Sequence, residues 1–364
     1  MRIAQAHMFT LRILRGIERC IVNLSNAFVR QGHEAVIVTG RTDAPKSADA
    51  LDPRVEVHMV PHWDWHKVTF VPGFALDFLR NEYGALLVNL ARGEGWAVAL
   101  ADRLRRLDFS IVLQYPVSGH HKQYRNWKWT GAARRARRLI AVSRYVAEGV
   151  EAYLGRRPHV ITNGVDPEKF RFDPEARLAV RRDLGLDDRD RLVVTVSALQ
   201  GRKGIGHVVA ALPRLLARAN GTRIRYAIVG DGAPQDRAAL EAAVRSAGLE
   251  STVTLVGLRS DPERYLSAAD AFALLSVDEA CPTVTLEALA CGLPVVVSNG
   301  SAFPELVPPG GGRLVRPDDH DAVADALGDV LAAGRPGDAA RAPTVARFAW
   351  EQIAGQYAAV LAGP

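Results

Sequence analysis

The sequence has no long apolar segment and few cysteines. Its longest apolar runs, such as Ala271–Leu275 and Leu293–Val297, are far shorter than the roughly 20 residues of a membrane-spanning helix. The first nine residues lack the apolar core of a signal peptide. The three cysteines, Cys20, Cys281 and Cys291, are widely spaced and do not follow metal-ligand spacing. We therefore expect buried free thiols and a cytoplasmic protein.

Length and composition indicate an ordinary globular protein of two domains. The chain has 364 residues, of which 48% are hydrophobic and 24% charged, and it contains no internal repeat or low-complexity tract. Charge is unevenly shared. Residues 1–165 hold 24 Lys and Arg against 14 Asp and Glu, a net charge of +10, whereas the remainder holds 22 against 26, a net charge of −4. The basic half favours an anionic partner, or is a solvated basic face.

Short β-rich runs alternate with longer helical patterns, such as residues 16–31, throughout the sequence. This alternation predicts an α/β protein with parallel sheets. The strands expected in the first half are Met1–Ala4, Ala35–Val38, Val55–Val60, Ile111–Tyr115, Leu139–Val142 and His159–Thr162. Those expected in the second half are Leu192–Val196, Arg225–Val229, Thr252–Val256, Ala271–Leu275, Pro294–Val297 and Arg313–Val315.

Composition places the domain boundary near Arg171. Residues 166–190 are rich in Asp, Arg and Pro and lack a strong strand pattern, as expected of an interdomain connection. Residues 336–343 resemble a linker, and an amphipathic helix is expected at residues 348–361. We therefore predict a first domain of residues 1–170 plus 345–364, and a second domain of residues 171–344.

The most informative segment is residues 276–296. It follows a predicted strand, has Pro282 at the expected start of a helix, and reaches Gly292 before the next strand. The unpaired N–H groups of the first helical turn favour a diphosphate. Glu279 and Glu287, on either side of this turn, can accept hydrogen bonds from sugar hydroxyls. The segment therefore predicts a nucleotide-sugar site, and the residues at its helix start are Pro282, Thr283 and Val284.

Glu279 and Glu287 resemble the E-x7-E signature of retaining glycosyltransferases of the GT-B fold, specifically family four. Further matches are Val160-Ile-Thr-Asn-Gly-Val-Asp166 to the family's "VIPNGVD", Ile228-Val-Gly-Asp-Gly232 to "IVGDG", Pro304-Glu305 to "PE", and Gly312-Arg-Leu-Val-Arg-Pro-Asp318 to "G-x-LV-x-P-x-D". The resemblance implies an α/β GT-B fold with two facing Rossmann-like domains and a C-terminal helix that crosses back to the first domain. It implies that the first domain binds the acceptor and that the second binds the nucleotide sugar. It also implies that Glu287 binds the ribose, that Glu279 binds the transferred sugar, and that Gly230 belongs to the nucleotide site.

Lys203-Gly204 resembles the family's "GR-L-x-x-x-KG" phosphate clamp. The ammonium of Lys203 would neutralise the departing diphosphate, most strongly in the transition state. The arginine of that pattern falls at Ala198 and is absent. Either Arg202 supplies the missing charge from the same loop, or Lys203 acts alone.

In the first domain the resemblance is weaker. The family's Gly-Gly pair is replaced by Arg15-Gly16, which leaves Gly16 as the residue that a phosphate can approach. His120 and His121 follow a predicted strand, and the family often places a histidine near the donor sugar there. We favour His120 for this role. Two exposed loop histidines are the alternative.

No bound metal is expected. Two Asp-x-Asp sequences occur, at residues 188–190 and 319–321, but the first lies in a charged stretch before a strand. The resemblance assigns Asp319 to the start of a helix. We expect no cofactor beyond the nucleotide-sugar co-substrate, with a UDP-sugar favoured, although no residue separates UDP from GDP.

The acceptor is not identified by the sequence. The segment 126–138 carries four arginines beside Trp127 and Trp129, which suits either peripheral contact with the inner face of an anionic membrane or a solvated helix. Trp63 and Trp65 either stack on a sugar acceptor or lie in a loop. An acceptor sugar, lipid or natural product is therefore expected, and no nucleic acid.

We predict a retaining, metal-independent glycosyltransferase. The alternatives are a sugar-nucleotide 2-epimerase of the same fold and a basic membrane- or nucleic-acid-binding module without catalysis. The second alternative leaves Glu279, Glu287 and Lys203 without a role. A nicotinamide dehydrogenase is disfavoured because Gly230-Asp-Gly232 lacks the third glycine of the dinucleotide-binding pattern.

Overall fold

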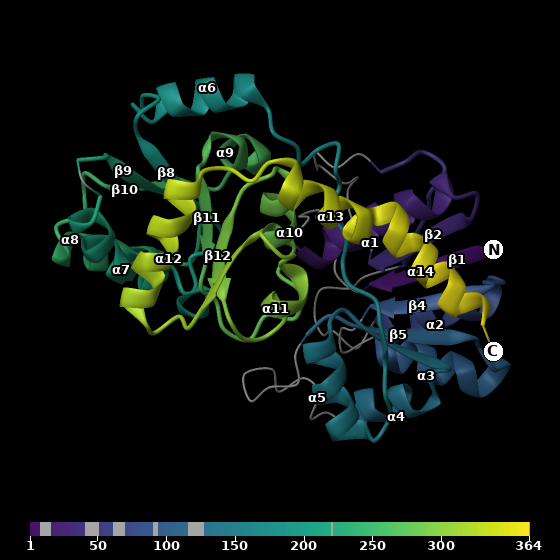
Figure 1. Cartoon of the computed structure of the whole chain (residues 1–364). Helices are drawn as coiled ribbons and strands as arrows, with labels where there is room; N and C mark the ends of the chain where they lie inside the picture. Colours follow the sequence, from purple (N-terminus) through teal and green to yellow (C-terminus); the bar gives the residue numbers. More distant parts are fainter. Residues whose placement is uncertain are drawn as a thin grey trace. The chain divides into compact units, whose positions relative to one another are not determined.

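The computed structural model describes residues 1–7, 16–40, 51–60, 70–89, 94–115, 127–219 and 221–363. The chain forms two compact units, each with its own sheet and helices (Figure 1). The first unit contains Met1–Gly164 and Trp350–Pro364, and the second contains Val165–Ala349.

The unit boundaries fall close to the predicted ones. Residues 165–170 and 345–349, which the sequence analysis assigns to the first domain, lie in the second unit. These two segments are hydrogen-bonded to each other, which explains why they belong to the same unit. The amide of Val165 donates to the carbonyl oxygen of Phe348 at 2.8 Å, and Val165 forms a parallel bridge with Ala349.

The first unit is a parallel sheet of seven strands in the order β3-β2-β1-β4-β5-β6-β7. Its strands are β1 (Arg2–His7), β2 (Glu34–Gly40), β3 (Glu56–Val60), β4 (Ala85–Asn89), β5 (Phe109–Leu113), β6 (Arg138–Ala141) and β7 (His159–Val160). Its helices are α1 (Gly16–Arg30), α2 (Phe70–Arg80), α3 (Glu94–Arg105), α4 (Trp127–Arg135), α5 (Arg144–Leu154) and α14 (Trp350–Ala362).

The second unit is a parallel sheet of six strands in the order β10-β9-β8-β11-β12-β13. Its strands are β8 (Arg191–Val196), β9 (Ile224–Val229), β10 (Val253–Gly257), β11 (Ala271–Leu274), β12 (Val295–Ser298) and β13 (Gly312–Val315). Its helices are α6 (Pro174–Asp183), α7 (Ile205–Ala217), α8 (Pro234–Ser246), α9 (Pro262–Ala268), α10 (Thr283–Ala290), α11 (Phe303–Leu306), α12 (His320–Ala333) and α13 (Asp338–Phe348).

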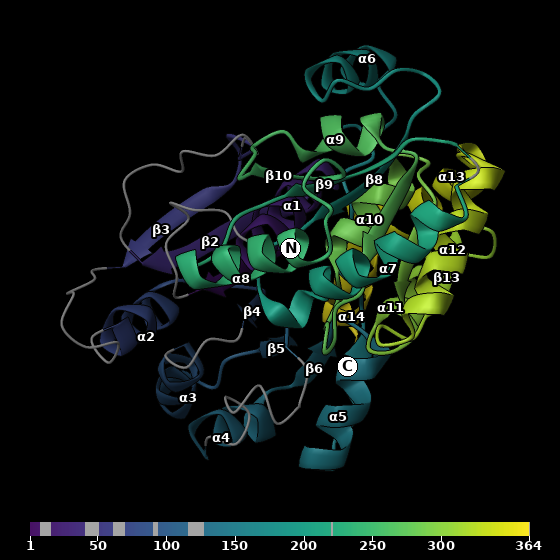
Figure 2. The same cartoon turned by 90° about the vertical axis from the view of Figure 1, so that its left-hand side faces the viewer.

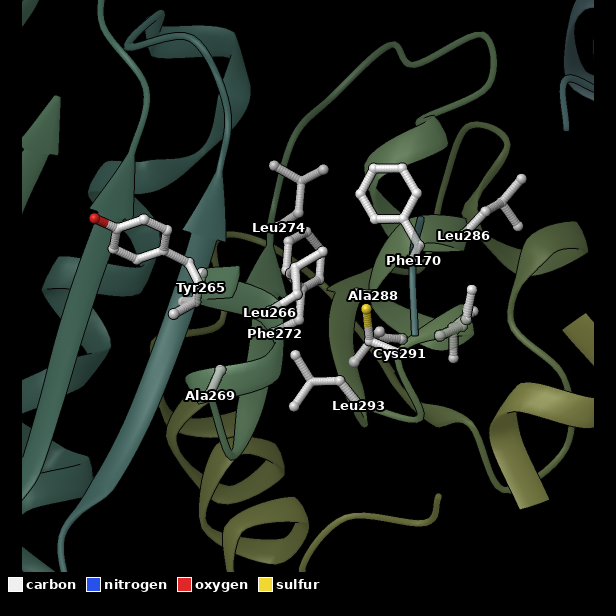
Figure 3. Packing of buried hydrophobic residues seen from close by; sticks show 14 of the residues in the cluster. Phe170, Tyr265, Leu266, Ala269, Phe272, Leu274, Leu286, Ala288, Cys291 and Leu293 are labelled. Carbon is white, nitrogen blue, oxygen red and sulfur yellow. The ribbon is translucent and has the colours of Figure 1, made fainter. Parts of the chain in front are cut away.

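Two hydrophobic cores cover the two faces of the second sheet. Along each strand, alternate residues point to opposite faces. Phe272 and Leu274 of β11 pack with Leu286 of α10 in one core (Figure 3). The neighbouring positions on β11, Ala271 and Ala273, pack in the other core, with residues of α7, α8 and α12. Figure 2 shows α7 beside α12, in agreement with their mutual contacts. The central strands β11 and β12 are buried on both faces, and their sequences are almost entirely apolar.

Residues 336–343 are not the linker that the sequence analysis predicts. Helix α13 begins at Asp338 and contains Pro343. The buried residues Ala340, Thr344 and Phe348 recur every four positions and form one helical face, and α13 packs against α10. This burial outweighs the helix-breaking tendency of the proline.

The C-terminal helix α14 packs on α1 in the first unit, as predicted (Figure 1). Its side chains Ile353, Tyr357 and Leu361 are buried, and the ring of Tyr357 meets that of Phe28 edge-on at 6.3 Å. The helix begins at Trp350 rather than at residue 348, because Ala349 separates it from α13.

None of the helices in the described residues is both long and apolar enough to cross a membrane. The three cysteines are free thiols, of which Cys20 and Cys291 are buried, as expected, and Cys281 is half-buried. Burial raises the pKa of the Cys291 thiol to about 12, so this side chain behaves as a small apolar group.

Candidate active site

The candidate site lies at the carboxyl edge of the second sheet. Strands β8 and β11 are adjacent and parallel, and the strand order reverses between them. In open α/β sheets, ligands bind beyond the carboxyl ends of the strands at such a reversal. The loop after β8 carries Arg202 and Lys203, and the loop after β11 carries Glu279. The topology therefore brings together residues that lie more than 70 positions apart in the sequence.

Lys203 and Glu279 form a close ion pair. The Nζ atom of Lys203 donates to Oε1 of Glu279 at 2.6 Å, and Nη1 of Arg202 lies 3.5 Å from the same oxygen. The side chains of Lys203 and Glu279 are 18% and 11% exposed, whereas that of Arg202 is 42% exposed. Two cationic groups therefore converge on one buried carboxylate.

The two loops are also joined through the main chain. The amide of Val277 donates to the carbonyl oxygen of Arg202 at 2.9 Å. Gly204 has a φ of +68°, and a Cβ atom there would lie 2.0 Å from the carbonyl oxygen of Leu275. Only glycine allows the Lys203 loop to approach β11 so closely.

The residue before Glu279 has an unusual backbone conformation. Asp278 has a φ of +61°, and its amide donates to Oγ of Ser301, which has a φ of +56°. In addition, the amide of Ala302 donates to the carbonyl oxygen of Glu279 at 3.3 Å. Non-glycine residues in this region cost about 1 kcal/mol or more and cluster at functional sites. Asp278 and Ser301 fix the position of Glu279, and no sequence pattern identifies them, although Asp tolerates this conformation better than most residues.

Helix α10 begins as the sequence predicts. Pro282 is its N-cap, Thr283 and Val284 are its first residues, and Gly292 follows its C-cap with a φ of +67°. Glu287 lies within the helix and is half-buried, and its contact with the ribose stays a prediction. The N-terminus of this helix and the two nearby cations together favour an anion.

Two buried hydroxyls accompany this helix. Oγ1 of Thr285, in the first turn of α10, and Oγ of Ser276, just after β11, have no hydrogen-bond partner among the described residues. A buried hydroxyl without a partner is unfavourable.

The two glycines predicted to lie in the nucleotide site, Gly230 and Gly16, have different surroundings. Gly230 has a φ of +144°, and a Cβ atom would lie 1.9 Å from the carbonyl oxygen of Ser197, so the fold itself requires glycine there. A nucleotide contact at Gly230 stays a prediction. Gly16 is the exposed first residue of α1, and a Cβ atom there would meet nothing within 4 Å. Its surface is accessible to a phosphate, although the preceding residues lie outside the described ranges.

Several predicted contacts cannot be placed. His120, His121, Trp63 and Trp65 lie outside the described residues. Trp127 and Trp129 lie on α4, and only their backbone positions are described.

Three arginines of the basic segment at 126–138 form ion pairs or hydrogen bonds within the first unit. Arg135 pairs with Asp102, Arg137 pairs with Asp108, and the buried Arg138 donates to the carbonyl oxygen of Leu361 in α14. The side chains of Arg135 and Arg137 are 44% and 48% exposed, which favours the solvated interpretation for these two. Arg138 lies in β6 and is 3% exposed, so the solvated interpretation is wrong for it.

Both Asp-x-Asp sequences carry structural hydrogen bonds. Asp190 binds Arg223, which lowers the pKa of the Asp190 carboxyl to about 2. Asp319 is the N-cap of α12 and accepts from the amide of Ala322 at 3.0 Å, as the sequence analysis predicts. No group of three or more His, Cys, Asp or Glu side chains in the described part of the chain is arranged to hold a metal ion.

Known families match both units. The model described as "Glycosyltransferase Family 4" matches residues 14–169, and the model described as "Glycosyl transferases group 1" matches residues 190–333. A GDP-mannose-dependent alpha-(1-6)-phosphatidylinositol monomannoside mannosyltransferase of Mycolicibacterium smegmatis is 33% identical over 274 residues, which are 68% of this chain and 70% of the relative. A GDP-mannose-dependent monoacylated alpha-(1-6)-phosphatidylinositol monomannoside mannosyltransferase of Corynebacterium glutamicum is 27% identical over 356 residues, which cover 90% of each chain.

Solved structures show the same architecture over the whole chain. The Anabaena protein Alr3699/HepE, crystallised with UDP-glucose, aligns with a TM-score of 0.84 and 22% identity over 99% of both chains. The sucrose-phosphate synthase of Thermosynechococcus elongatus aligns with a TM-score of 0.80 and 24% identity over 99% of this chain and 98% of that one. The prediction of the GT-B fold is confirmed.

Proposed function

This chain belongs to glycosyltransferase family 4, and we propose that it transfers a hexose from a nucleotide-sugar donor to an acceptor hydroxyl with retention of the anomeric configuration. The observation that carries the proposal is the convergence of Lys203 and Arg202 on Glu279 at the carboxyl ends of β8 and β11, beside the N-terminus of α10.

The charges of this edge match the needs of the reaction. As the glycosidic C–O bond breaks, negative charge builds on the diphosphate. Lys203 and the N-terminus of α10 would stabilise that charge, and Arg202 would replace the arginine that the family pattern places at Ala198. Because Arg202 reaches the same carboxylate as Lys203, it has the length and direction for this role.

The proposed step needs no protein base. The acceptor oxygen forms a bond to the anomeric carbon on the face that the diphosphate leaves, and the acceptor proton passes to the departing phosphate oxygen. Glu279 would bind hydroxyls of the transferred sugar, and its ion pair with Lys203 would keep both side chains in position. Glu287 would bind the ribose.

The donor that we propose is GDP-mannose. The relatives from Mycolicibacterium and Corynebacterium are named as GDP-mannose-dependent, and they match most of the chain. The sequence analysis favours a UDP-sugar without a residue that distinguishes the two bases. Both donors therefore belong in the first assay.

The acceptor that we propose is a lipid-linked mannoside or inositol. Support comes from the names of the same relatives, which act on phosphatidylinositol monomannosides. Such an acceptor places the protein at the inner face of a membrane as a peripheral enzyme, consistent with the net charge of residues 1–165.

Product analysis by NMR tests the proposal. The full chain is incubated with GDP-mannose, UDP-glucose or UDP-N-acetylglucosamine and with phosphatidylinositol monomannoside or methyl α-mannoside as acceptor. We expect an α-linked mannoside and free GDP. A β-linked product contradicts retention, and absence of transfer from every donor contradicts the proposed function. A thermal-shift series with GDP, UDP, ADP and NAD reports the base preference separately, because a ligand of the native state raises Tm.

A further inference from the structure

The first turn of helix α7 follows directly on the loop that carries Lys203. Lys203 is the last residue of a 3-10 turn, Gly201–Lys203, and Gly204 is both the C-cap of this turn and the N-cap of α7. The amide of His207 donates to the carbonyl oxygen of Gly204 at 3.1 Å. A displacement of this helical turn would therefore move Lys203 with it.

A second histidine joins His207 to helix α12. Nδ1 of His207 lies 3.1 Å from Nε2 of His320, the first residue of α12, and both rings are half-buried. The ring centres are 5.4 Å apart and the ring planes are inclined at 40°, so the rings meet nitrogen to nitrogen and are not stacked. One ring donates its N–H and the other accepts with its lone pair, so the pair shares one hydrogen.

A cavity of about 330 Å³ borders the same turn. His207 and His320 line it together with residues of α7 and α8, and Gly204 and Gly206 have no side chain that could fill it. The turn therefore lacks, on this side, the close packing that fixes most of a protein interior. On the β11 side the loop is held by the hydrogen bond from the amide of Val277 to the carbonyl oxygen of Arg202. The histidine pair supplies a second anchor, on the helix side.

We propose that His207 and His320 are positioning residues for the donor: their hydrogen bond holds the first turn of α7, and through it Lys203, in the position that contacts the diphosphate. The inference rests on the proposed function, which assigns Lys203 to the diphosphate. It extends the phosphate-clamp motif, which ends at Gly204 and includes neither histidine.

Acid should break this contact. A second proton places an N–H on both facing nitrogens, so neither can accept and the two charged rings repel each other. Burial, followed by the charge of His320, lowers the pKa of His207, whereas Asp318 acts in the opposite direction. The acidic groups on the elements packed against this turn are Asp236 of α8, Asp318 and Asp319 before α12, and Asp321 within it. Asp318 and Asp321 pair with Arg316 and Arg214. The pair is therefore intact at pH 7.5 and opens in acid.

Substitutions that keep or remove one ring nitrogen test this role. The amide of Asn places a hydrogen-bonding atom near the position of Nδ1 in His, so His207→Asn retains the contact, whereas His207→Leu removes it. In calorimetric titration with GDP or UDP at pH 7.5, we expect His207→Leu to weaken binding about fivefold and His207→Asn to stay within about twofold of the wild type. The control Asp325→Ala breaks the pair with Arg218, which joins the same two helices at the C-terminal end of α7, and should leave binding unchanged. Equal affinity of the wild type and His207→Leu would overturn the proposal.

A pH series covers the case in which His207→Leu does not fold. The wild type is compared with the double variant His207→Asn/His320→Gln at pH 7.5 and at pH 5.5, because a comparison at each pH cancels the titration of the nucleotide's own terminal phosphate. Gln places a hydrogen-bonding atom near the position of Nε2 in His, so the double variant keeps a contact that does not titrate. We expect acid to weaken nucleotide binding about threefold more in the wild type.

The outcomes separate this inference from the proposed function. A purely structural role of the pair would lower Tm in acid without a difference in nucleotide affinity, and parallel affinity curves would overturn the proposal. Sugar transfer by the wild type is scored separately. Parallel curves in a chain that transfers sugar leave the proposed function standing, whereas a chain that binds the nucleotide but transfers no sugar contradicts the proposed function alone.

Discussion

The two units share a strand order but differ in the chemistry of their carboxyl edges. In the second unit, Lys203, Arg202 and Glu279 converge within 3.5 Å. At the corresponding edge of the first unit, neutral amide side chains form a row, Gln5, Asn89, Gln114 and Asn163. The same topology can therefore carry charged groups or uncharged hydrogen-bonding groups, depending on the side chains near the ends of its strands.

The largest effect is expected from removing α14, which shows how far the first unit depends on the end of the chain. Truncation after Ala349 exposes the surface that Ile353, Tyr357 and Leu361 cover, each worth about 1.5–3 kcal/mol. We expect aggregation on expression, measured by size-exclusion chromatography. The control Glu351→Ala removes only the exposed pair with Arg30. A soluble, active truncation would show that the helix is dispensable.

A buried ion-pair cluster around Asp270 stabilises the second unit. Asp270 is buried, pairs with Arg177 and the buried Arg181, and accepts from the amide of Leu192 at 2.8 Å. Asp270→Ala leaves Arg181 without its carboxylate, so we expect the free energy of unfolding to fall by about 3 kcal/mol in a urea titration. Asp325→Ala breaks the exposed ion pair with Arg218, and we expect it to lower the free energy of unfolding by less than about 1 kcal/mol. Equal losses for the two variants would refute this role of Asp270.

The two glutamates should separate turnover from nucleotide affinity. Glu279→Gln keeps the shape but loses the charge that holds Lys203, and we expect kcat to fall about 100-fold with GDP affinity nearly unchanged. Glu287→Ala should instead weaken GDP binding about tenfold. Steady-state rates and calorimetric titration measure the two quantities. If both variants bind GDP as the wild type does, the assignment of Glu287 to the ribose is wrong.

A small effect of pH is expected from His207, which lies in the first turn of α7 with its Nδ1 3.1 Å from Nε2 of His320. Burial, followed by the nearby His320, lowers the pKa of His207 below its usual 6.5. The unfolded chain therefore binds a proton more readily than the folded one, so stability is full above pH 6.5 and falls as the pH drops below that value. Tm measured from pH 7.5 to 5.5 should decline less in His207→Gln. Parallel declines would contradict this origin.

No effect is expected from removing divalent metal. Asp190 and Asp319 are occupied by Arg223 and by the amide of Ala322, and the cations beside α10 can neutralise a diphosphate. Initial rates after EDTA treatment should match those with added magnesium. Complete loss of activity, restored by magnesium or manganese, would show that a cation replaces the arginine missing at Ala198.

The sequence predicts regular, buried elements best. Strands such as Val295–Ser298 are runs of β-branched residues between turns, and their positions agree with the structure. Strand β4, Ala85–Asn89, is not predicted, because its Ala-Leu-Leu run has no β-specific pattern. Helix α13 is misinterpreted as a linker because composition does not show which face packs on α10.

The candidate site also contains a part that the sequence predicts and a part that it does not. Lys203, Glu279 and Glu287 are predicted from motifs of local sequence, and the structure brings Lys203 and Glu279 together. The support of Glu279 by Ser301, and the amide row of the first unit, depend on contacts between residues far apart in the chain. No local pattern encodes such contacts, so only the folded arrangement of the strand ends reveals them.

The central claim is that the charged edge of the second unit binds the diphosphate. Calorimetric titration of GDP into the wild type, Lys203→Met and the control Lys169→Met tests it most directly. Lys169 is a lysine of the same unit whose Nζ lies 5.7 Å from the ring centroid of Phe170. We predict that Lys203→Met weakens GDP binding about tenfold or more, because a charge-assisted contact is lost, while Lys169→Met binds GDP as the wild type does. Equal affinity of wild type and Lys203→Met would contradict the claim.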